Sequence, residues 1–497
     1  MKKALQALLF FLVMLASAKA LRPSSSSMIG LQKRRSSHWS YMNSMRSKKD
    51  GFIPPDFELR TYSQTLDHFN FGPERYITFQ QRYAINFKHW GGASSNSPIF
   101  LYTGDEAGLD GDLVAGFPVD IAPRFKALLV FVEHRYYGKS YPFGSKEEAY
   151  RNSSTLQYFS SEQALADYAE FIRDLKKSLS AENSPVIAMG GSYGGMLAAW
   201  FRLKYPHVVI GALASSAPIL YFDDITPQNG YYSVVTKDFR ETSKSCYETI
   251  KTSWSEIDKV AAQKDGLSSL SQMFNTCSRM NNSEDLKNGL EGLFSASAQY
   301  DDPKMKPVSR ICAGIDKEPN GTSVLQRIVS GIKAVYGGSK CFDIAGTDED
   351  LISGWSWQVC TEMVMPIGIS NNSTMFEPSP FDLRTLSSIC KQLFNVNPRP
   401  HWITTEFGGH KIKDVLKRFG SNIIFSNGLR DPYSSGGVLQ KISNSIVALV
   451  TAKGSHCLDI LGSNDADPEW LISQRNAEVK ILENWIEEYN AIYKINK

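Results

Sequence analysis

The sequence predicts an α/β protein whose parallel sheet is interrupted by a large, mostly helical insertion. Parallel strands that are buried on both faces are expected to read as short, continuous apolar runs. Five such runs occur along the chain: residues 98–102, 127–132, 185–189, 422–425 and 445–450. Between the third and fourth runs the strand signals thin out, and polar segments with helical character dominate. We therefore expect one α/β domain that is built from two separate parts of the chain.

Two amphipathic helices complete this pattern. Apolar side chains recur at helical spacing over residues 161–179, and lysines stand near the end of that segment, as is common at helix C-termini. The segment lies between two strand runs, and this strand–helix–strand order is typical of parallel sheets. A second amphipathic helix is expected at 468–493, near the C-terminus.

The first twenty residues have the features of a secretory signal peptide. Two lysines precede an apolar stretch at 8–16, and residues 18–20 offer a small-x-small cleavage site. The apolar stretch is shorter than the ~20 residues that a membrane span needs. A signal anchor is the alternative, which the cleavage site disfavours. We expect a protein of the secretory pathway, destined for the vacuole or lysosome or for the cell exterior, without membrane attachment after signal cleavage.

Together these patterns divide the chain into five parts. They are a signal peptide at 1–20, a pro-segment or disordered N-terminus at 21–56, the first part of the α/β domain at 57–217, a helical cap insertion at 218–401, and the second part of the α/β domain at 402–497. The formal net charge of +3 depends on the N-terminus, because residues 1–50 hold ten Lys or Arg and one acid. The remaining chain has 44 basic and 50 acidic residues, so no nucleic-acid partner is expected.

Cysteines and glycosylation sequons fit an oxidising compartment. None of the seven cysteines forms a CxxC pair, so we expect no metal site and no cofactor. Six can form three disulfides in several alternative pairings, and Cys457 is left over. The six are Cys246, Cys277, Cys312, Cys341, Cys360 and Cys390. The sequons are at Asn152, Asn281, Asn320, Asn371 and Asn372.

A glycine-rich segment around Ser192 has the pattern G-x-S-x-G. It follows the strand run at 185–189 and precedes a plausible helix at 196–204. In a nucleophile elbow the chain turns sharply from a strand into a helix, so small residues must flank the serine. A glycine-rich turn without catalysis is the alternative. We interpret Ser192 as a candidate nucleophile.

The expected triad partners follow Ser192 in the order acid, then histidine. Four histidines come after Ser192, and only His456 lies on a loop just beyond a late strand run. Asp431 likewise follows the run at 422–425, although an aspartate before proline is also common in ordinary turns. The order and the placement at strand ends predict Asp431 as the orienting acid and His456 as the base.

These residues predict acyl-transfer chemistry. His456 would take the proton of Ser192 and return it to the leaving amine, while Asp431 holds the imidazole. The backbone N–H of Tyr193 and one from the loop after the 98–102 run, near Gly104 and Asp105, are expected to bind the oxyanion, with Gly104 as the first choice.

Seven segments, in a fixed order, resemble a known peptidase family. They are QTLDHF at 64–69, TFQQRY at 78–83, EHRYYG at 133–138, GGSYGGMLAAW at 190–200, CTEMVMP at 360–366, SNG and DP within 426–432, and GSH at 454–456. The family is that of lysosomal Pro-X carboxypeptidase, dipeptidyl peptidase II and thymus-specific serine protease. The resemblance covers nearly all of residues 57–497, and within the family the chain is most similar to the Pro-X carboxypeptidases.

The resemblance implies an α/β-hydrolase fold with a helical, disulfide-bonded cap. It also implies exopeptidase action on short proline-containing peptides, and an apolar pocket for the proline ring that includes Met196 and Met365. Tyr433 replaces a tryptophan of the carboxypeptidase, and Cys457 replaces a second histidine found in many relatives. The implied disulfides are Cys246–Cys312, Cys277–Cys341 and Cys360–Cys390.

The polarity of the exopeptidase stays open at this stage. A carboxypeptidase needs a cation or N–H donors for the substrate carboxylate, whereas a dipeptidyl aminopeptidase that releases X-Pro dipeptides needs an acid for the ammonium group. Asp105, Glu106 and Glu362 are acids that could serve the second role. A non-peptidase esterase and a catalytically silent binding protein are further alternatives, and a homodimer is an expected assembly.

Overall fold

The computed structural model describes residues 53–72, 76–337, 341–342, 344, 354–369 and 374–495. The expected signal peptide at 1–20 and nearly all of the N-terminal segment at 21–56 lie outside these residues, as do the sequons at Asn371 and Asn372. The other three sequon asparagines are exposed, namely Asn152, Asn281 and Asn320.

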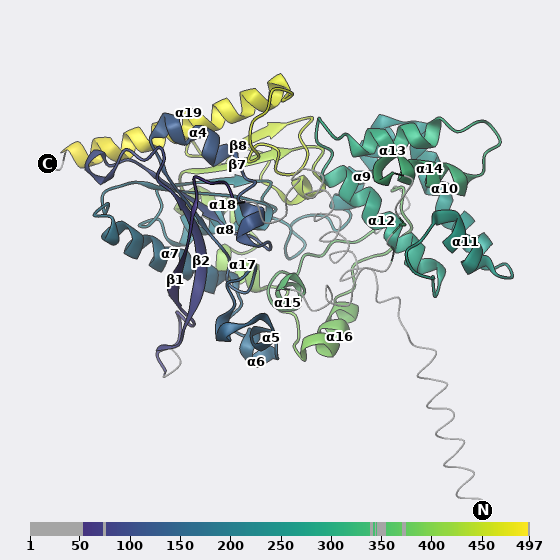
Figure 1. The fold of residues 1–497 in the computed structure, drawn as a ribbon, viewed down its shortest axis with the longest axis horizontal. Coiled ribbons are helices and arrows are strands. Elements are labelled where there is room, and N and C mark those ends of the chain that lie inside the picture. The colour runs from purple at the N-terminus through teal and green to yellow at the C-terminus, as the bar shows by residue number, and fades with distance from the viewer. Residues whose placement is uncertain are drawn as a thin grey trace, which may run out of the picture.

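One sheet of eight strands runs through the described part of the chain (Figure 1), in the spatial order β1-β2-β4-β3-β5-β6-β7-β8. β2 pairs antiparallel with β1 and β4, and all later neighbours are parallel. This is the strand order of the α/β-hydrolase fold, and the protein has that fold. The strands are β1 (Glu58–Thr65), β2 (Thr78–Asn86), β3 (Ile99–Thr103), β4 (Leu128–Val132), β5 (Val186–Gly191), β6 (Gly211–Ser215), β7 (Ile423–Gly428) and β8 (Ile446–Thr451).

The central strands are buried on both faces. Every residue of β3, β4, β5, β6 and β7 is buried, which is why their sequences read as continuous apolar or small runs. The edge strand β8 is only half-buried. The edge strand β1 is more exposed still; it pairs with β2, and its Tyr62 packs against Phe171 of α7 (Ser161–Ser178).

Helices cover the two faces of the sheet. The helices α7 (Ser161–Ser178) and α8 (Ser192–Lys204) contribute to one core cluster, which also contains side chains of the cap. The helices α4 (Phe117–Phe125) and α19 (Glu469–Ile495) contribute to a second core cluster on the opposite face. Figure 1 shows α19, in yellow, and α4 together along one side of the sheet, with α7 on the other.

A group of helices is inserted between β6 and β7. We call it the cap; its helices are α9 (Gly230–Thr242), α10 (Lys244–Ala261), α11 (Gly266–Phe274), α12 (Ser283–Gln299), α13 (Pro307–Asp316), α14 (Val324–Tyr336), α15 (Gly354–Thr361) and α16 (Leu383–Phe394). Figure 1 shows α9 to α14 gathered away from the sheet, while α15 and α16 lie separately, below the sheet. The short helices α17 (Trp402–Phe407) and α18 (Ile412–Phe419) lead back to β7.

Three disulfides hold the cap. They join Cys246 to Cys312, Cys277 to Cys341, and Cys360 to Cys390, the pairs that the resemblance implies. The first links α10 to α13 and the third links α15 to α16. Such crosslinks typically stabilise a fold by ~2–4 kcal/mol each, in the usual account by restricting the unfolded chain. Cys457 is a free, buried thiol.

None of the helices within the described ranges combines the length and the apolar character that crossing a membrane requires.

Candidate active site

Ser192 stands at the turn from β5 into α8. β5 ends at Gly191 and α8 begins at Ser192 itself, whose φ of 55° lies in the left-handed region that side chains rarely adopt. A Cβ on Gly190 would lie 2.4 Å from the backbone of Gly194, and one on Gly194 would lie 2.6 Å from the Thr103 carbonyl oxygen. The turn therefore requires glycine on both sides of the serine, as a nucleophile elbow does.

Asp431 and His456 lie on the loops that follow β7 and β8. Asp431 is fully buried and caps a short 3-10 helix, because its Oδ1 accepts the N–H of Tyr433 at 2.9 Å. Its Oδ2 lies 2.8 Å from His456 Nδ1. A carboxylate in this position fixes the imidazole with its proton on Nδ1, which leaves Nε2 free to accept a proton.

His456 is buried with its other ring nitrogen unoccupied. The side chain is 3% exposed, and Nε2 has no hydrogen-bond partner among the described residues. Burial alone would lower the pKa of His456, but the charge of Asp431 and the hydrogen bond to it outweigh burial and raise it well above its ordinary value. The backbone N–H of His456 donates to the carbonyl of Gln299 at the end of cap helix α12, at 2.9 Å.

Ser192 and His456 line one cavity, which we call the Ser192 cavity. Its wall also includes Tyr102, Asp105, Glu106, Asp112, Tyr300, Cys457 and Leu461. The structure therefore brings together the three residues that the sequence singles out as a triad. The serine and the histidine are on the wall of the same cavity, and the aspartate is hydrogen-bonded to the histidine. Burial raises the pKa of the Cys457 thiol, so this neighbour of the histidine is neutral.

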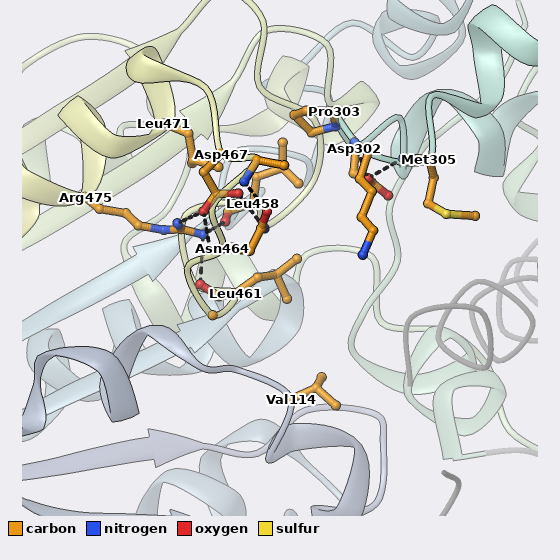
Figure 2. A pocket seen from close by; sticks show the side chains of 13 residues that line it. Val114, Asp302, Pro303, Met305, Leu458, Leu461, Asn464, Asp467, Leu471 and Arg475 are labelled. Carbon is orange, nitrogen blue, oxygen red and sulfur yellow. Dashed lines mark hydrogen bonds and ion pairs between the residues drawn. The ribbon is translucent and has the colours of Figure 1, made fainter. Parts of the chain in front are cut away.

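A second cavity adjoins the first and shares Val114 and Leu461 with it. Figure 2 shows its lining, with Arg475 turned toward Asp467. Arg475 donates to Asp467 Oδ2 at 2.5 Å and to three backbone carbonyls, so its guanidinium is already occupied. Lys304 is the other cation of this lining, and it is exposed.

The oxyanion donors differ in part from the expectation. Tyr193 is in the first turn of α8, where backbone N–H groups have no partner within the helix. The expected second donor, Gly104, is wrong, because its N–H donates to the carbonyl of Val132 at 3.1 Å. The N–H groups of the next two residues, Asp105 and Glu106, donate to no backbone carbonyl within the described part of the chain. One of these is the available second donor.

The side chain of Tyr193 ties the elbow to the cap. Its hydroxyl accepts a hydrogen bond from Gln358 Nε2 at 2.7 Å and lies 3.0 Å from His134 Nε2. His134 Nδ1 donates to the Arg135 carbonyl, and burial lowers the pKa of His134 to about 4. The imidazole is therefore neutral, and its Nε2 accepts the proton of the Tyr193 hydroxyl. Gln358 was not predicted as a site residue, because nothing in the sequence around it indicates that α15 brings it to Tyr193.

Glu362 does not line the Ser192 cavity. Its carboxyl group accepts the N–H of Ser161 at 2.9 Å and the Ser161 hydroxyl at 2.8 Å, and it also accepts from Gln358. Burial raises the pKa of Glu362 to about 8. Its hydrogen bonds connect α15 to the start of α7, which gives this acid a visible role in joining the cap to the α/β domain.

The residues expected to bind proline do not line the Ser192 cavity. Met196 is 1% exposed and Met365 is 7% exposed, and both belong to the large core cluster. Tyr433 is half-buried, and its ring centroid lies 5.5 Å from that of His456. Of the three, only Tyr433 is thus shown in direct contact with the triad.

A family model and the relatives of the chain agree with this geometry. The model described as "Serine carboxypeptidase S28" matches residues 64–478. Lysosomal Pro-X carboxypeptidase of Mus musculus is 40% identical over 464 residues, which covers 88% of this chain and 91% of the relative. Thymus-specific serine protease of Homo sapiens is 29% identical over 457 residues, with 85% of each chain covered.

Among solved structures, the acetyl esterase MekB is similar over 86% of this chain and 96% of its own, with 14% identity and a TM-score of 0.39. That score is too low to add to the fold assignment, which depends on the strand order. The family match covers most of the chain and includes every residue of the triad. The protein therefore belongs to the serine carboxypeptidase S28 family, and it is a serine-type peptidase.

Proposed function

We propose that this protein is an exopeptidase that cleaves short peptides next to proline and releases the C-terminal residue that follows the proline. The observation that carries the proposal is the triad geometry, with His456 held by Asp431 and facing the same cavity as Ser192. The relatives named as Pro-X carboxypeptidases supply the substrate class, at up to 40% identity over 91% of their length.

The steps follow from the positions of the side chains. His456 Nε2 takes the proton of Ser192 as the hydroxyl oxygen attacks the scissile carbonyl, and it returns that proton to the amine of the leaving residue. The N–H of Tyr193 and the N–H of Asp105 bind the oxyanion, and the N-terminus of α8 adds a favourable dipole. Water then hydrolyses the acyl-enzyme by the same path in reverse. Removing one such donor typically costs about 10²–10³ in turnover.

The proline subsite is proposed at the contact between the elbow helix and the cap. Met196 comes from α8, Met365 follows α15, and Tyr433 stands beside the base. A proline ring offers no N–H, so shape and apolar burial must recognise it, at about 25 cal/mol per Å². Binding there would place the carbonyl of the proline near Ser192.

A dipeptidyl aminopeptidase is the second candidate, and the acids of the Ser192 cavity favour it. Two blocked peptides separate the candidates: one N-capped and ending in Pro-Phe, the other C-capped and beginning Lys-Pro. We expect turnover of the first alone. The Ser192→Ala variant is the control and should retain the fold while losing both turnover and labelling by a fluorophosphonate probe. Cleavage of only the second peptide would reverse the assigned polarity.

The compartment is proposed to be the lumen of the vacuole or lysosome, or the cell exterior. Three disulfides and three exposed sequon asparagines are typical of proteins that pass through the secretory pathway. Relatives are named as lysosomal. A homodimer stays a prediction, which sedimentation of the processed protein would test.

A further inference from the structure

The Ser192 cavity has an acidic wall. Asp105, Glu106 and Asp112 line it together with Ser192 and His456, and no lysine or arginine is among the described residues of its lining. His456, whose buried Nε2 has no hydrogen-bond partner among the described residues, is on the wall of the same cavity. A carboxypeptidase must bind a negatively charged C-terminus within one residue of the scissile bond. Ionised acids on this wall would repel the C-terminal carboxylate of a substrate.

Two of the three acids form a pair that holds one proton. When one of them holds a proton, the carboxyl groups of Asp105 and Asp112 can share a hydrogen bond. Burial, followed by the charges of Asp105 and Glu133, raises the pKa of Asp112 well above its ordinary value, so Asp112 carries the proton. Asp105 also accepts the N–H of Ala107 at 2.8 Å, which favours its charged form. Burial nevertheless raises the pKa of Asp105 to about 6, so Asp105 is the anion of the pair above that pH.

Glu106 differs from this pair because it is exposed to the cavity. No other residue in the described ranges makes a hydrogen bond or ion pair with its carboxyl group, which interacts only with its own backbone N–H. Enclosure by the surrounding protein, together with the charge of Asp105, raises the pKa of Glu106 to about 8. Solvent in the cavity screens part of this effect, and Glu106 still takes up its proton at a higher pH than an ordinary glutamate.

The ionisable groups around Glu106 come from several elements. They are Asp105 and Asp112 on its own loop and α3 (Leu109–Asp112), His456 after β8, Tyr300 after α12, Tyr193 at the elbow, and Tyr137. Asp105 opposes ionisation of Glu106, and a protonated His456 favours it. The tyrosines are neutral, because burial raises their pKa values. His456 must be neutral to act as the base, and a neutral imidazole no longer favours ionisation of Glu106, so Glu106 keeps its proton in that form of the site.

We propose that the uncharged carboxylic acid of Glu106 donates a hydrogen bond to the C-terminal carboxylate of the substrate and thereby selects carboxypeptidase polarity. A carboxylic acid and a carboxylate form a short, charge-assisted hydrogen bond of about 2.5–2.7 Å between oxygens. The leaving residue must lie beside His456, which returns its proton, and Glu106 is on the wall of the same cavity. This inference rests on the proposed function, because an aminopeptidase would use an ionised acid to hold an ammonium group.

The test compares two N-capped peptides that end in Pro-Phe, one with a free carboxylate and one amidated. For the wild type, KM for the free acid should rise as pH is raised from about pH 5 to about pH 9, because Glu106 ionises, while KM for the amide stays level. Glu106→Ala should raise KM for the free acid by about 10–100-fold and change the amide little. Glu106→Gln keeps a donor that cannot ionise, so it should restore binding and remove the rise with pH.

Glu488→Gln, on the exposed face of α19, is the matched control and should change neither peptide. Fluorophosphonate labelling of Ser192 reports an intact site in every variant. Equal losses on both peptides in Glu106→Ala would overturn the proposal, as would a selective effect on the free acid in Lys304→Met without one in Glu106→Ala. No turnover of either N-capped peptide by the wild type, with the C-capped Lys-Pro peptide cleaved, would instead overturn the proposed function.

Discussion

At the scale of single residues, the pair of Asp431 and His456 sets both the speed and the pH range of the enzyme. Asp431 fixes the tautomer of the imidazole and raises its pKa. The base must be neutral to accept a proton from Ser192, so activity is lost as pH falls through the pKa of His456. The same carboxylate that orients the base therefore moves the acid limit of activity upward.

Replacing Asp431 by asparagine should separate these effects. We expect Asp431→Asn to lower kcat by about 10⁴, because an amide no longer enforces the productive tautomer. The pKa of His456 should also fall, so the acid limb of the kcat/KM profile should move to lower pH. The residual activity, measured from pH 4 upward on the Pro-Phe peptide, checks both. An unchanged acid limb would mean that another group controls it.

Met365 provides a residue-scale test of the proline subsite. Met365→Ala should lower kcat/KM on a proline peptide by about tenfold more than on the matched alanine peptide, since it removes apolar contact with the ring. Melting temperature is measured alongside, because the side chain is buried in the core. A loss that is equal for the two peptides and parallels the melting temperature would identify Met365 as a packing residue only.

Some residues of the site could be predicted from sequence and others could not. Ser192, Asp431 and His456 could be predicted because each follows a strand run and the three occur in the required order. In the structure all three meet at one site. Gly104 failed as an oxyanion donor because its N–H continues the pairing of β3 with β4, a register that the sequence does not reveal. Asp112 was missed because its relation to Asp105 exists only in three dimensions.

At the scale of elements, α15 links the cap to the nucleophile. Gln358 on this helix donates to the Tyr193 hydroxyl, and Glu362 just beyond the helix accepts from Ser161 on α7. The Cys360–Cys390 disulfide ties α15 to α16 between these two contacts. The position of α15 is therefore fixed covalently and by hydrogen bonds to both α7 and α8.

Removing this disulfide should affect catalysis as well as stability. We expect the double variant Cys360→Ser with Cys390→Ser to lose ~2–4 kcal/mol of unfolding free energy, and to label more slowly at Ser192 because α15 no longer supports Tyr193. The matched control is Cys277→Ser with Cys341→Ser, whose bridge lies elsewhere in the cap. It should lower stability while leaving kcat/KM nearly unchanged. Equal effects of the two double variants on labelling would contradict this role of α15.

The elements that sequence analysis found and missed differ in composition. The strands β3, β4, β5, β7 and β8 were predicted within a few residues, because their apolar runs are continuous. β6, with the sequence Gly-Ala-Leu-Ala-Ser, was not predicted, because small side chains give little hydrophobic signal. Its small residues have a reason: a Cβ on Gly211 would lie 2.4 Å from the ring of Trp485 on α19.

At the scale of the whole molecule, buried carboxyl groups make stability depend on pH. Burial raises the pKa of Asp238 and of Glu362 to about 8, and raises that of Asp112 and Glu478 well above the ordinary range. Above about pH 4 the folded protein therefore binds more protons than the unfolded chain. This stabilisation is complete below the unfolded pKa values and is lost as pH rises through the folded ones.

The melting temperature should accordingly fall between about pH 5 and about pH 8, by at least ~2 °C. His134 acts in the opposite sense, because burial lowers its pKa to about 4. The stability that its neutral form contributes is present above the pKa of an unfolded histidine and is lost as pH falls toward about 4. The four carboxyl groups with raised pKa values change the free energy of unfolding more than the one histidine does, so stability falls as pH rises. Calorimetry on the Ser192→Ala variant avoids self-digestion, and Glu362→Gln should flatten the slope. A melting temperature that rises from pH 5 to pH 8 would contradict this account.

The hydrogen bond from the His456 N–H to the Gln299 carbonyl has a consequence for how the cap can change over evolution. The nucleophile, the acid and the base all stand on loops of the α/β domain, yet the backbone of the base is held by a helix of the cap. A substitution that reshapes α12 to admit a different peptide also shifts the imidazole. A new specificity that arises by reshaping this end of α12 is therefore selected at the same time for its effect on proton transfer.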